Sequence, residues 1–169
     1  MFKIGSYVMY GNQGVCRVVE IRRESFSGTA KDYYILSPLD DEKMTIYVPM
    51  DAEALVSRMR PLLSPDQIAA LIREGCTAET MEWTDNARGR SEQFRQILQS
   101  GDQQRLIVMI RTIYERKELQ LAKGKKLYSA DEAAFEKAEK LLHGEIAAVL
   151  NIRPDQVQDY IQSQLTAKG

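Results

Sequence analysis

The fold is decided at residues 64–67, Ser64-Pro65-Asp66-Gln67, where the periodicity of the chain changes. A serine can cap free amides, proline suits the first helical position, and a glutamine three residues after the serine can complete a capping box. Short β-branched and aromatic runs precede this point, and helical periodicity follows it. We therefore predict an α+β protein with two domains, residues 1–62 and residues 63–169, that meet near residues 60–64.

The first domain is predicted to consist of short strands. The candidate strands cover residues 7–10, 15–21, 33–36 and 44–48. Between them lie turn or loop signals at residues 11–14, 25–32 and 40–43. Pro49 should end the last candidate strand, because proline donates no ladder hydrogen bond. Strands of this spacing favour a small, strongly bent sheet or barrel.

The second domain is predicted to be an all-helical bundle. One helix should run from Pro65 to Gly75, a second should cover about 85–99, and Asp102 can cap a third. Two further helices should begin at the capping box of residues 129–132 and at Pro154. The third helix carries an apolar stripe: Leu106, Met109, Ile110, Ile113 and Tyr114. Arg111 lies off this stripe and should face solvent. The helix that begins near 129 has an apolar face of Phe135, Ala138, Leu142, Ile146 and Val149. The helix that begins at 154 has an apolar face of Val157, Ile161 and Leu165.

Composition indicates an ordinary globular protein. Hydrophobic residues make up 44% of the chain and charged residues 28%. No apolar run approaches the roughly 20 residues of a membrane helix, and the first residues do not resemble a signal peptide. We expect a soluble, cytoplasmic protein that does not contact membranes.

The sequence lacks the residues that catalysis or metal binding would need. His143 is the single histidine, too little for a nucleophilic triad, and Cys16 and Cys76 stand far apart in unlike contexts. Gly124-Lys125 is followed by lysine and lacks the hydroxyl of a phosphate-binding loop. We therefore expect no enzyme activity, no metal, no cofactor and no small-molecule substrate.

Charge is unevenly distributed along the chain. Residues 83–126 contain ten Lys or Arg and five Asp or Glu, whereas 61–82 and 127–169 are each net negative by three charges. A basic zone between acidic flanks suits weak, directed contact with phosphates. It does not suit strong independent DNA binding, which needs a more basic domain.

Trp83, the single tryptophan, admits two interpretations. It could be a core or interdomain anchor. Alternatively, it could be an exposed wedge, because Arg88 and Arg90 follow closely and a large ring beside cations can press into nucleic acid while the cations hold phosphates. Composition alone leaves both interpretations open.

These residues, taken together, resemble the CarD family of RNA polymerase-binding proteins, whose N-terminal module also occurs in the transcription-repair coupling factor. The matching residues of the first half are Phe2-x-x-Gly5, Val8-x-Tyr10, Gly14-Val15, Ile21, Gly28, Tyr33-Tyr34-x-Leu36, Val48-Pro49 and Arg60. Those of the second half are Trp83, Arg90, Ser100-Gly101-Asp102, the lysine-rich turn with Leu127, and Ala138-x-x-Leu141-Leu142-x-x-Glu145. The resemblance covers essentially the whole chain.

The resemblance implies a Tudor-like, SH3-like β-barrel domain that binds the β subunit of RNA polymerase. It also implies a helical domain that contacts the minor groove of promoter DNA at the upstream edge of the melted bubble. Trp83 would insert at that junction and stabilise the open complex, which favours the wedge interpretation. The alternative is an adaptor that binds RNA polymerase and recruits another protein without touching DNA. We expect a monomer.

The predicted site residues fall into two sets. The DNA-binding set is Trp83, Arg88, Arg90, Arg111, Lys123, Lys125 and Lys126. The polymerase-binding set is Arg17, Arg22, Arg23, Tyr47 and Pro49. Tyr47 stands where some relatives carry an arginine that meets polymerase. The three arginines could substitute for that contact, or they could simply be solvent-facing strand residues.

Overall fold

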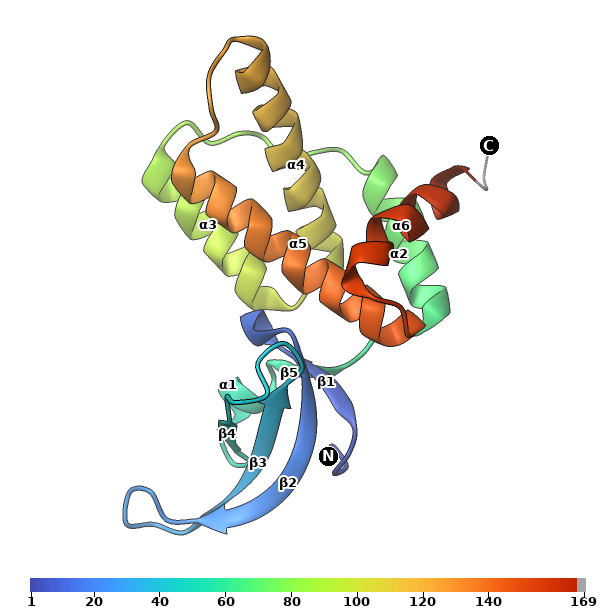
Figure 1. Cartoon of the computed structure of the whole chain (residues 1–169). Coiled ribbons are helices and arrows are strands. Elements are labelled where there is room, and N and C mark those ends of the chain that lie inside the picture. The colour runs from blue at the N-terminus through green and yellow to red at the C-terminus, as the bar shows by residue number, and fades with distance from the viewer. Residues whose placement is uncertain (167–169) are drawn as a thin grey trace. The chain divides into compact units, whose positions relative to one another are not determined.

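The computed structural model describes residues 1–166, which divide into two compact units (Figure 1). The first unit is Met1–Leu62 and the second begins at Leu63. The layout is α+β: a five-stranded antiparallel sheet is followed by helices.

The sheet of the first unit has the order β4-β3-β2-β1-β5. Its strands are β1 (Tyr7–Tyr10), β2 (Val15–Glu24), β3 (Lys31–Pro38), β4 (Ile46–Pro49) and β5 (Met59–Pro61). No pairing between β4 and β5 closes the sheet within residues 1–166, so the predicted barrel is not confirmed. A short helix, α1 (Glu53–Val56), and the strand β5 were not predicted from the sequence.

Strand register explains the core of this unit. Val8 on β1 lies opposite Cys16 on β2, and Val18 lies opposite Leu36 on β3. All four side chains are buried in one cluster. A register shift between Val18 and Glu20 bends β2. Residues 11–13 form a short 3-10 turn, η1 (Gly11–Gln13), where the sequence predicted a turn.

The second unit contains five α-helices among its described residues. They are α2 (Pro65–Thr77), α3 (Ala87–Ser100), α4 (Gln103–Ala122), α5 (Ser129–Leu150) and α6 (Val157–Thr166), with the 3-10 turn η2 (Pro154–Gln156) before α6. α4 packs against α5 and α2, and α3 packs against α5 (Figure 1). The apolar faces of the five helices contribute to one buried cluster. Among residues 1–166, no helix is both long and apolar enough to cross a membrane.

The predicted capping interactions were right at two helix starts and wrong at a third, although that helix does begin at Ser129. Ser64 and Gln67 form the reciprocal capping box, and the Asp102 carboxylate accepts hydrogen bonds from the Gln104 and Arg105 amides. The capping box predicted at Ser129 is absent, because the N-cap of α5 is Tyr128 and its side chain makes no capping bond.

Two predictions about α2 and α4 were also wrong. Gly75 does not end α2, which continues to Thr77. A carbon added at Gly75 would lie 2.2 Å from Ile107 Cγ2, so glycine there permits a close approach of α2 and α4. Tyr114 was placed in the apolar stripe of α4, yet it is exposed.

Candidate nucleic-acid interface

Trp83 lies in an irregular segment between α2 and α3 that is held at several points. The Met81 amide donates to Thr112 Oγ1 on α4 at 2.9 Å. The Asn86 side chain caps α3 by accepting a hydrogen bond from the Gly89 amide at 3.1 Å. These bonds anchor the backbone on both sides of the tryptophan.

The indole of Trp83 is half-buried and packs against the core of the helical unit. Its ring meets Phe94 edge-on, with 6.2 Å between centroids. The guanidinium carbon of Arg90 lies 4.6 Å from the ring centroid, and that of Arg116 lies 5.2 Å away. Each distance is within the range of a cation–π contact. Trp83 is therefore neither fully buried nor a free surface ring.

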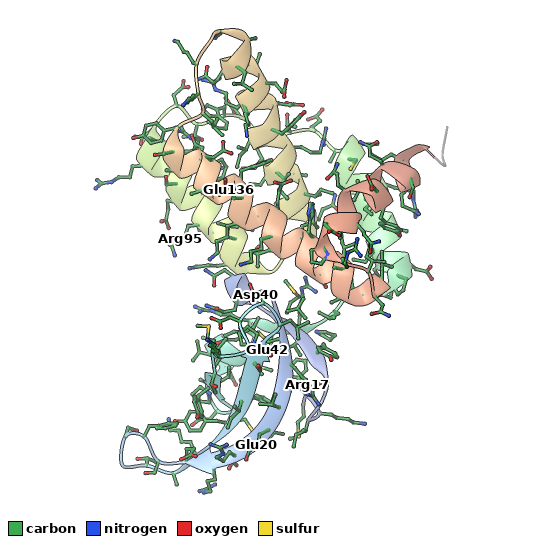
Figure 2. The ribbon with its side chains drawn as sticks, in the orientation of Figure 1. Arg17, Glu20, Asp40, Glu42, Arg95 and Glu136 are labelled. Carbon is green, nitrogen blue, oxygen red and sulfur yellow. The ribbon has the colours of Figure 1, made fainter. Side chains whose placement is uncertain are left out.

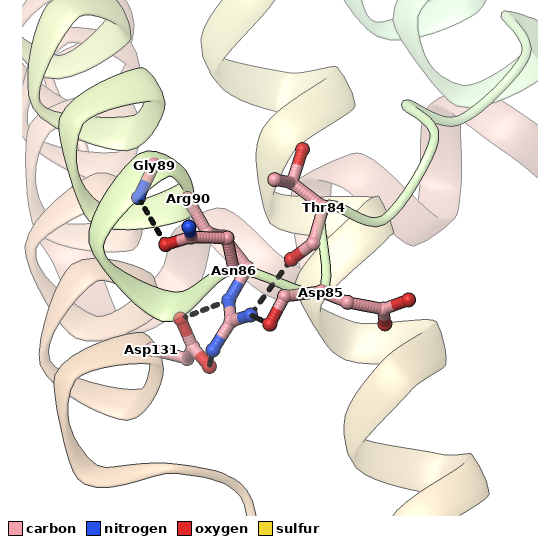
Figure 3. A network of polar contacts seen from close by, with 6 residues as sticks. All are labelled: Thr84, Asp85, Asn86, Gly89, Arg90 and Asp131. Carbon is pink, nitrogen blue, oxygen red and sulfur yellow. Dashed lines mark hydrogen bonds and ion pairs between the residues drawn. The ribbon is translucent and has the colours of Figure 1, made fainter.

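Arg90 is held in place by a network of polar contacts (Figure 3). Its Nε and Nη2 both donate to the Asp131 carboxylate at 2.8 Å, and its Nη1 donates to the Thr84 carbonyl at 2.8 Å. Arg90 is only 6% exposed and Asp131 only 1%. The prediction that Arg90 contacts DNA phosphates is therefore wrong, because its guanidinium is buried and bonded within the protein.

Arg111 also differs from its prediction. It was expected to face solvent and contact DNA, yet it is partly buried and its Nη1 donates to the carbonyls of Gly75 and Ala78. The last carbonyls of a helix lack partners within the helix, so a cation there is favourable. Arg111 thus caps the C-terminal end of α2 instead of presenting its charge to a ligand.

The remaining predicted cations are exposed. Arg88 lies in the first turn of α3, and Lys123, Lys125 and Lys126 surround Gly124 after the end of α4. Gly124 has a φ of 71°, which lets the chain turn sharply there. None of these four side chains forms an ion pair within the described part of the chain. They remain available to phosphate groups.

Sequence reasoning missed three residues beside Trp83. Arg116 lies over its ring, Asp131 holds Arg90, and the exposed Tyr128 has its ring centroid 6.0 Å from the Arg90 guanidinium carbon. Asp131 lies 41 residues beyond Arg90. No local pattern could therefore reveal that they pair.

The predicted polymerase-binding arginines lie on β2 of the sheet unit. Arg17, Arg22 and Arg23 are all exposed. Arg22 bonds to Glu20 and Glu24, and this contact lowers the pKa of Glu20. Arg23 pairs with Asp32, whereas Arg17 has no ion pair among the described residues. Figure 2 shows Arg17 and Glu20 on this strand.

Tyr47 and Pro49 belong to β4, an edge strand of the sheet. Tyr47 is 40% exposed and meets Phe26 and Tyr33 edge-on, with ring centroids 5.1 and 6.2 Å away. The three rings form an aromatic cluster beside the edge. An edge strand and exposed rings are common features of protein-binding surfaces.

Comparison with known families identifies a family for the first unit. Residues 2–62 match the family described as the CarD-like/TRCF RID domain. No curated protein matches the chain. The match covers the sheet unit and does not extend into the helical unit. Because RID domains interact with RNA polymerase, the match suggests RNA polymerase binding. The sheet unit therefore belongs to the CarD-like/TRCF RID domain family, as its residues predicted, and the chain is consistent with a CarD-like protein.

Proposed function

We propose that this protein is a transcription regulator that binds RNA polymerase through its sheet unit and promoter DNA through its helical unit. The sheet unit binds the β subunit of RNA polymerase. The helical unit contacts the upstream fork of the melted bubble and stabilises the open complex. This role requires no catalysis and no cofactor from the chain, and one copy suffices.

The observation that carries the DNA half of the proposal is the setting of Trp83. Its backbone is anchored on both sides, its ring is only half-buried, and two guanidinium groups lie over it. A ring held in place loses little conformational freedom when it binds. Separating a base step costs roughly a few kcal/mol, which a ring inserted at a fork can partly offset.

In this proposal the exposed cations contact DNA phosphates and so orient the helical unit, and with it Trp83, on the DNA. Arg88 and the lysines at 123, 125 and 126 are free to contact phosphates, which carry no sequence information but fix position. Four such contacts give weak, salt-dependent affinity. Attachment to polymerase compensates, because it raises the effective concentration of the helical unit at the fork.

The edge of the sheet supports the polymerase half of the proposal. The outer side of β4 has no partner strand within residues 1–166, and Tyr47 and Pro49 lie on that strand. An edge strand can accept a strand from a partner, and neighbouring side chains then give specificity. Arg17, which has no ion pair among the described residues, supplies a free charge on the same sheet.

The test uses the full chain with RNA polymerase on a promoter and measures the lifetime of the open complex. Trp83→Ala should shorten the lifetime added by the protein by about tenfold, which corresponds to roughly 1.4 kcal/mol. Arg95→Ala is the control: Arg95 is exposed on α3, and its bonding partners within residues 1–166 are the nearby Glu92 and Gln99.

Circular dichroism and thermal melting must show that Trp83→Ala is folded, since the ring packs on Phe94. Trp83→Phe, which keeps an aromatic ring at the packed position, is the second variant. A folded Trp83→Ala protein with undiminished effect would overturn the wedge. Polymerase binding without any crosslink from the helical unit to fork DNA would favour the protein-only adaptor.

A further inference from the structure

A second aromatic ring, contributed by a distant part of the chain, lies near the same Arg90 guanidinium as Trp83. The ring centroid of Tyr128 is 6.0 Å from the guanidinium carbon of Arg90, and the ring centroid of Trp83 is 4.6 Å from the same atom. The two rings therefore lie beside one guanidinium group of the helical unit, although 45 residues separate them in sequence.

Apart from its contact with the Arg90 guanidinium, the side chain of Tyr128 is largely exposed. Its side chain is 60% exposed, it makes no capping bond to α5, and no hydrogen bond of its hydroxyl is present among the described residues. Neither the core nor the helix cap accounts for tyrosine at this position.

The backbone of Tyr128 is nevertheless held firmly. Its carbonyl accepts hydrogen bonds from the amides of Asp131 and Glu132, both at 3.0 Å. Asp131 is in turn tied to Arg90. The same buried ion pair that supports the Trp83 segment therefore also supports the start of α5, and it fixes both rings to one scaffold.

The charge around Tyr128 identifies its partner. Lys123, Lys125 and Lys126 immediately precede it and form no ion pair among the described residues. Exposed aromatic rings beside free cations are the common design of single-strand nucleic-acid sites, where the bases stack and the cations follow the phosphates.

We propose that Tyr128 is a second nucleic-acid contact, whose ring stacks on an unpaired base of the melted promoter strand next to the step that Trp83 opens. This inference rests on the proposed function and extends it from one wedge residue to a two-ring surface. Trp83 inserts at the junction of duplex and bubble, and Tyr128 stacks on a base that is already unpaired.

The experiment uses the full chain bound to RNA polymerase on a promoter fork that carries 2-aminopurine in its single-stranded upstream portion. Stacking of the probe on an aromatic ring quenches its fluorescence. Loss of one base–aromatic stack lowers affinity by about tenfold, so Tyr128→Ala should weaken fork binding by that factor and restore probe fluorescence. Tyr128→Phe should behave as the parent, because the ring is kept.

Tyr114→Ala is the matched control. Tyr114 is also an exposed tyrosine of the helical unit, 53% accessible, but it lies two residues from Arg116 on α4 and therefore roughly 200° around that helix. This variant should leave fork affinity and probe fluorescence unchanged. Affinity for fully paired DNA of equal length should not change in any of the three variants.

Unchanged fork affinity and probe fluorescence in Tyr128→Ala would overturn the inference, and so would an equal loss on paired DNA. Loss of polymerase affinity in a binary assay without DNA would assign the ring to a protein contact instead. If Trp83→Ala shortens the open complex while Tyr128→Ala does nothing, only the second contact fails. If neither variant has an effect, the proposed function fails as well.

Discussion

Replacing Arg90 by methionine should destabilise the helical unit more than any loss of a surface charge could. Arg90 and Asp131 are 6% and 1% exposed, and two hydrogen bonds of 2.8 Å join them. Arg90→Met leaves the Asp131 carboxylate buried without its counterion. Breaking a buried pair in this way costs about 3–5 kcal/mol.

This cost is large compared with the stability of a small domain, about 5–15 kcal/mol. At roughly 4 °C per kcal/mol for a unit of about a hundred residues, the melting temperature should fall by about 12–20 °C. The assay is urea unfolding of the full chain, followed by circular dichroism and by tryptophan fluorescence. Trp83 is the only tryptophan, so its emission reports on the helical unit alone.

The double variant Arg90→Met/Asp131→Leu separates charge burial from packing. It removes both charges, and apolar replacements of buried ion pairs are often neutral or stabilising, so most of the lost stability should return. The Thr84 carbonyl lacks its donor in both variants, so in both Trp83 should emit at longer wavelength than in the parent. The reasoning is refuted if Arg90→Met costs less than about 1 kcal/mol, or if the double variant is no more stable than the single one.

Four further outcomes can be measured on the same protein. Gly75→Ala should lower the free energy of unfolding by about 1–3 kcal/mol, because the added methyl meets α4. Gly144→Ala, where no atom lies within 4 Å of the added carbon, should raise it by up to about 1 kcal/mol. Burial raises the pKa of the Cys16 thiol to about 12, so a disulfide reagent at neutral pH should modify it only after unfolding; early labelling of Cys16 would contradict this. Burial lowers the pKa of the His143 imidazole below 6.5, so on acidification the imidazole is protonated in the unfolded chain before it is protonated in the folded one. The free energy of unfolding should therefore fall as the pH drops through about 6.5. Between about pH 7.5 and pH 5.5, His143→Gln should lose less stability than the parent.

Local signals predicted much of the architecture. The capping residues Ser64 and Asp102 act within one helical turn, and both bond as expected. The strands precede the long helices along the chain as predicted, and only the short α1 and β5 were not expected. β5 has only three residues and pairs with β1 across about fifty positions, so no local pattern marks it. The residue pattern of the first unit also predicted its family, which the comparison confirmed.

The candidate site was predictable only in part. Trp83 and the exposed lysines stood out by residue type and charge, and that much the sequence determined by itself. Tertiary structure decided which arginines are available: Arg90 and Arg111 look like surface cations in sequence, yet one is bonded to Asp131 and the other caps α2. Periodicity reports which face of a helix is apolar, whereas the partner of a buried charge depends on which distant segment packs against it. That packing is also what brings Tyr128 beside the same guanidinium that supports Trp83.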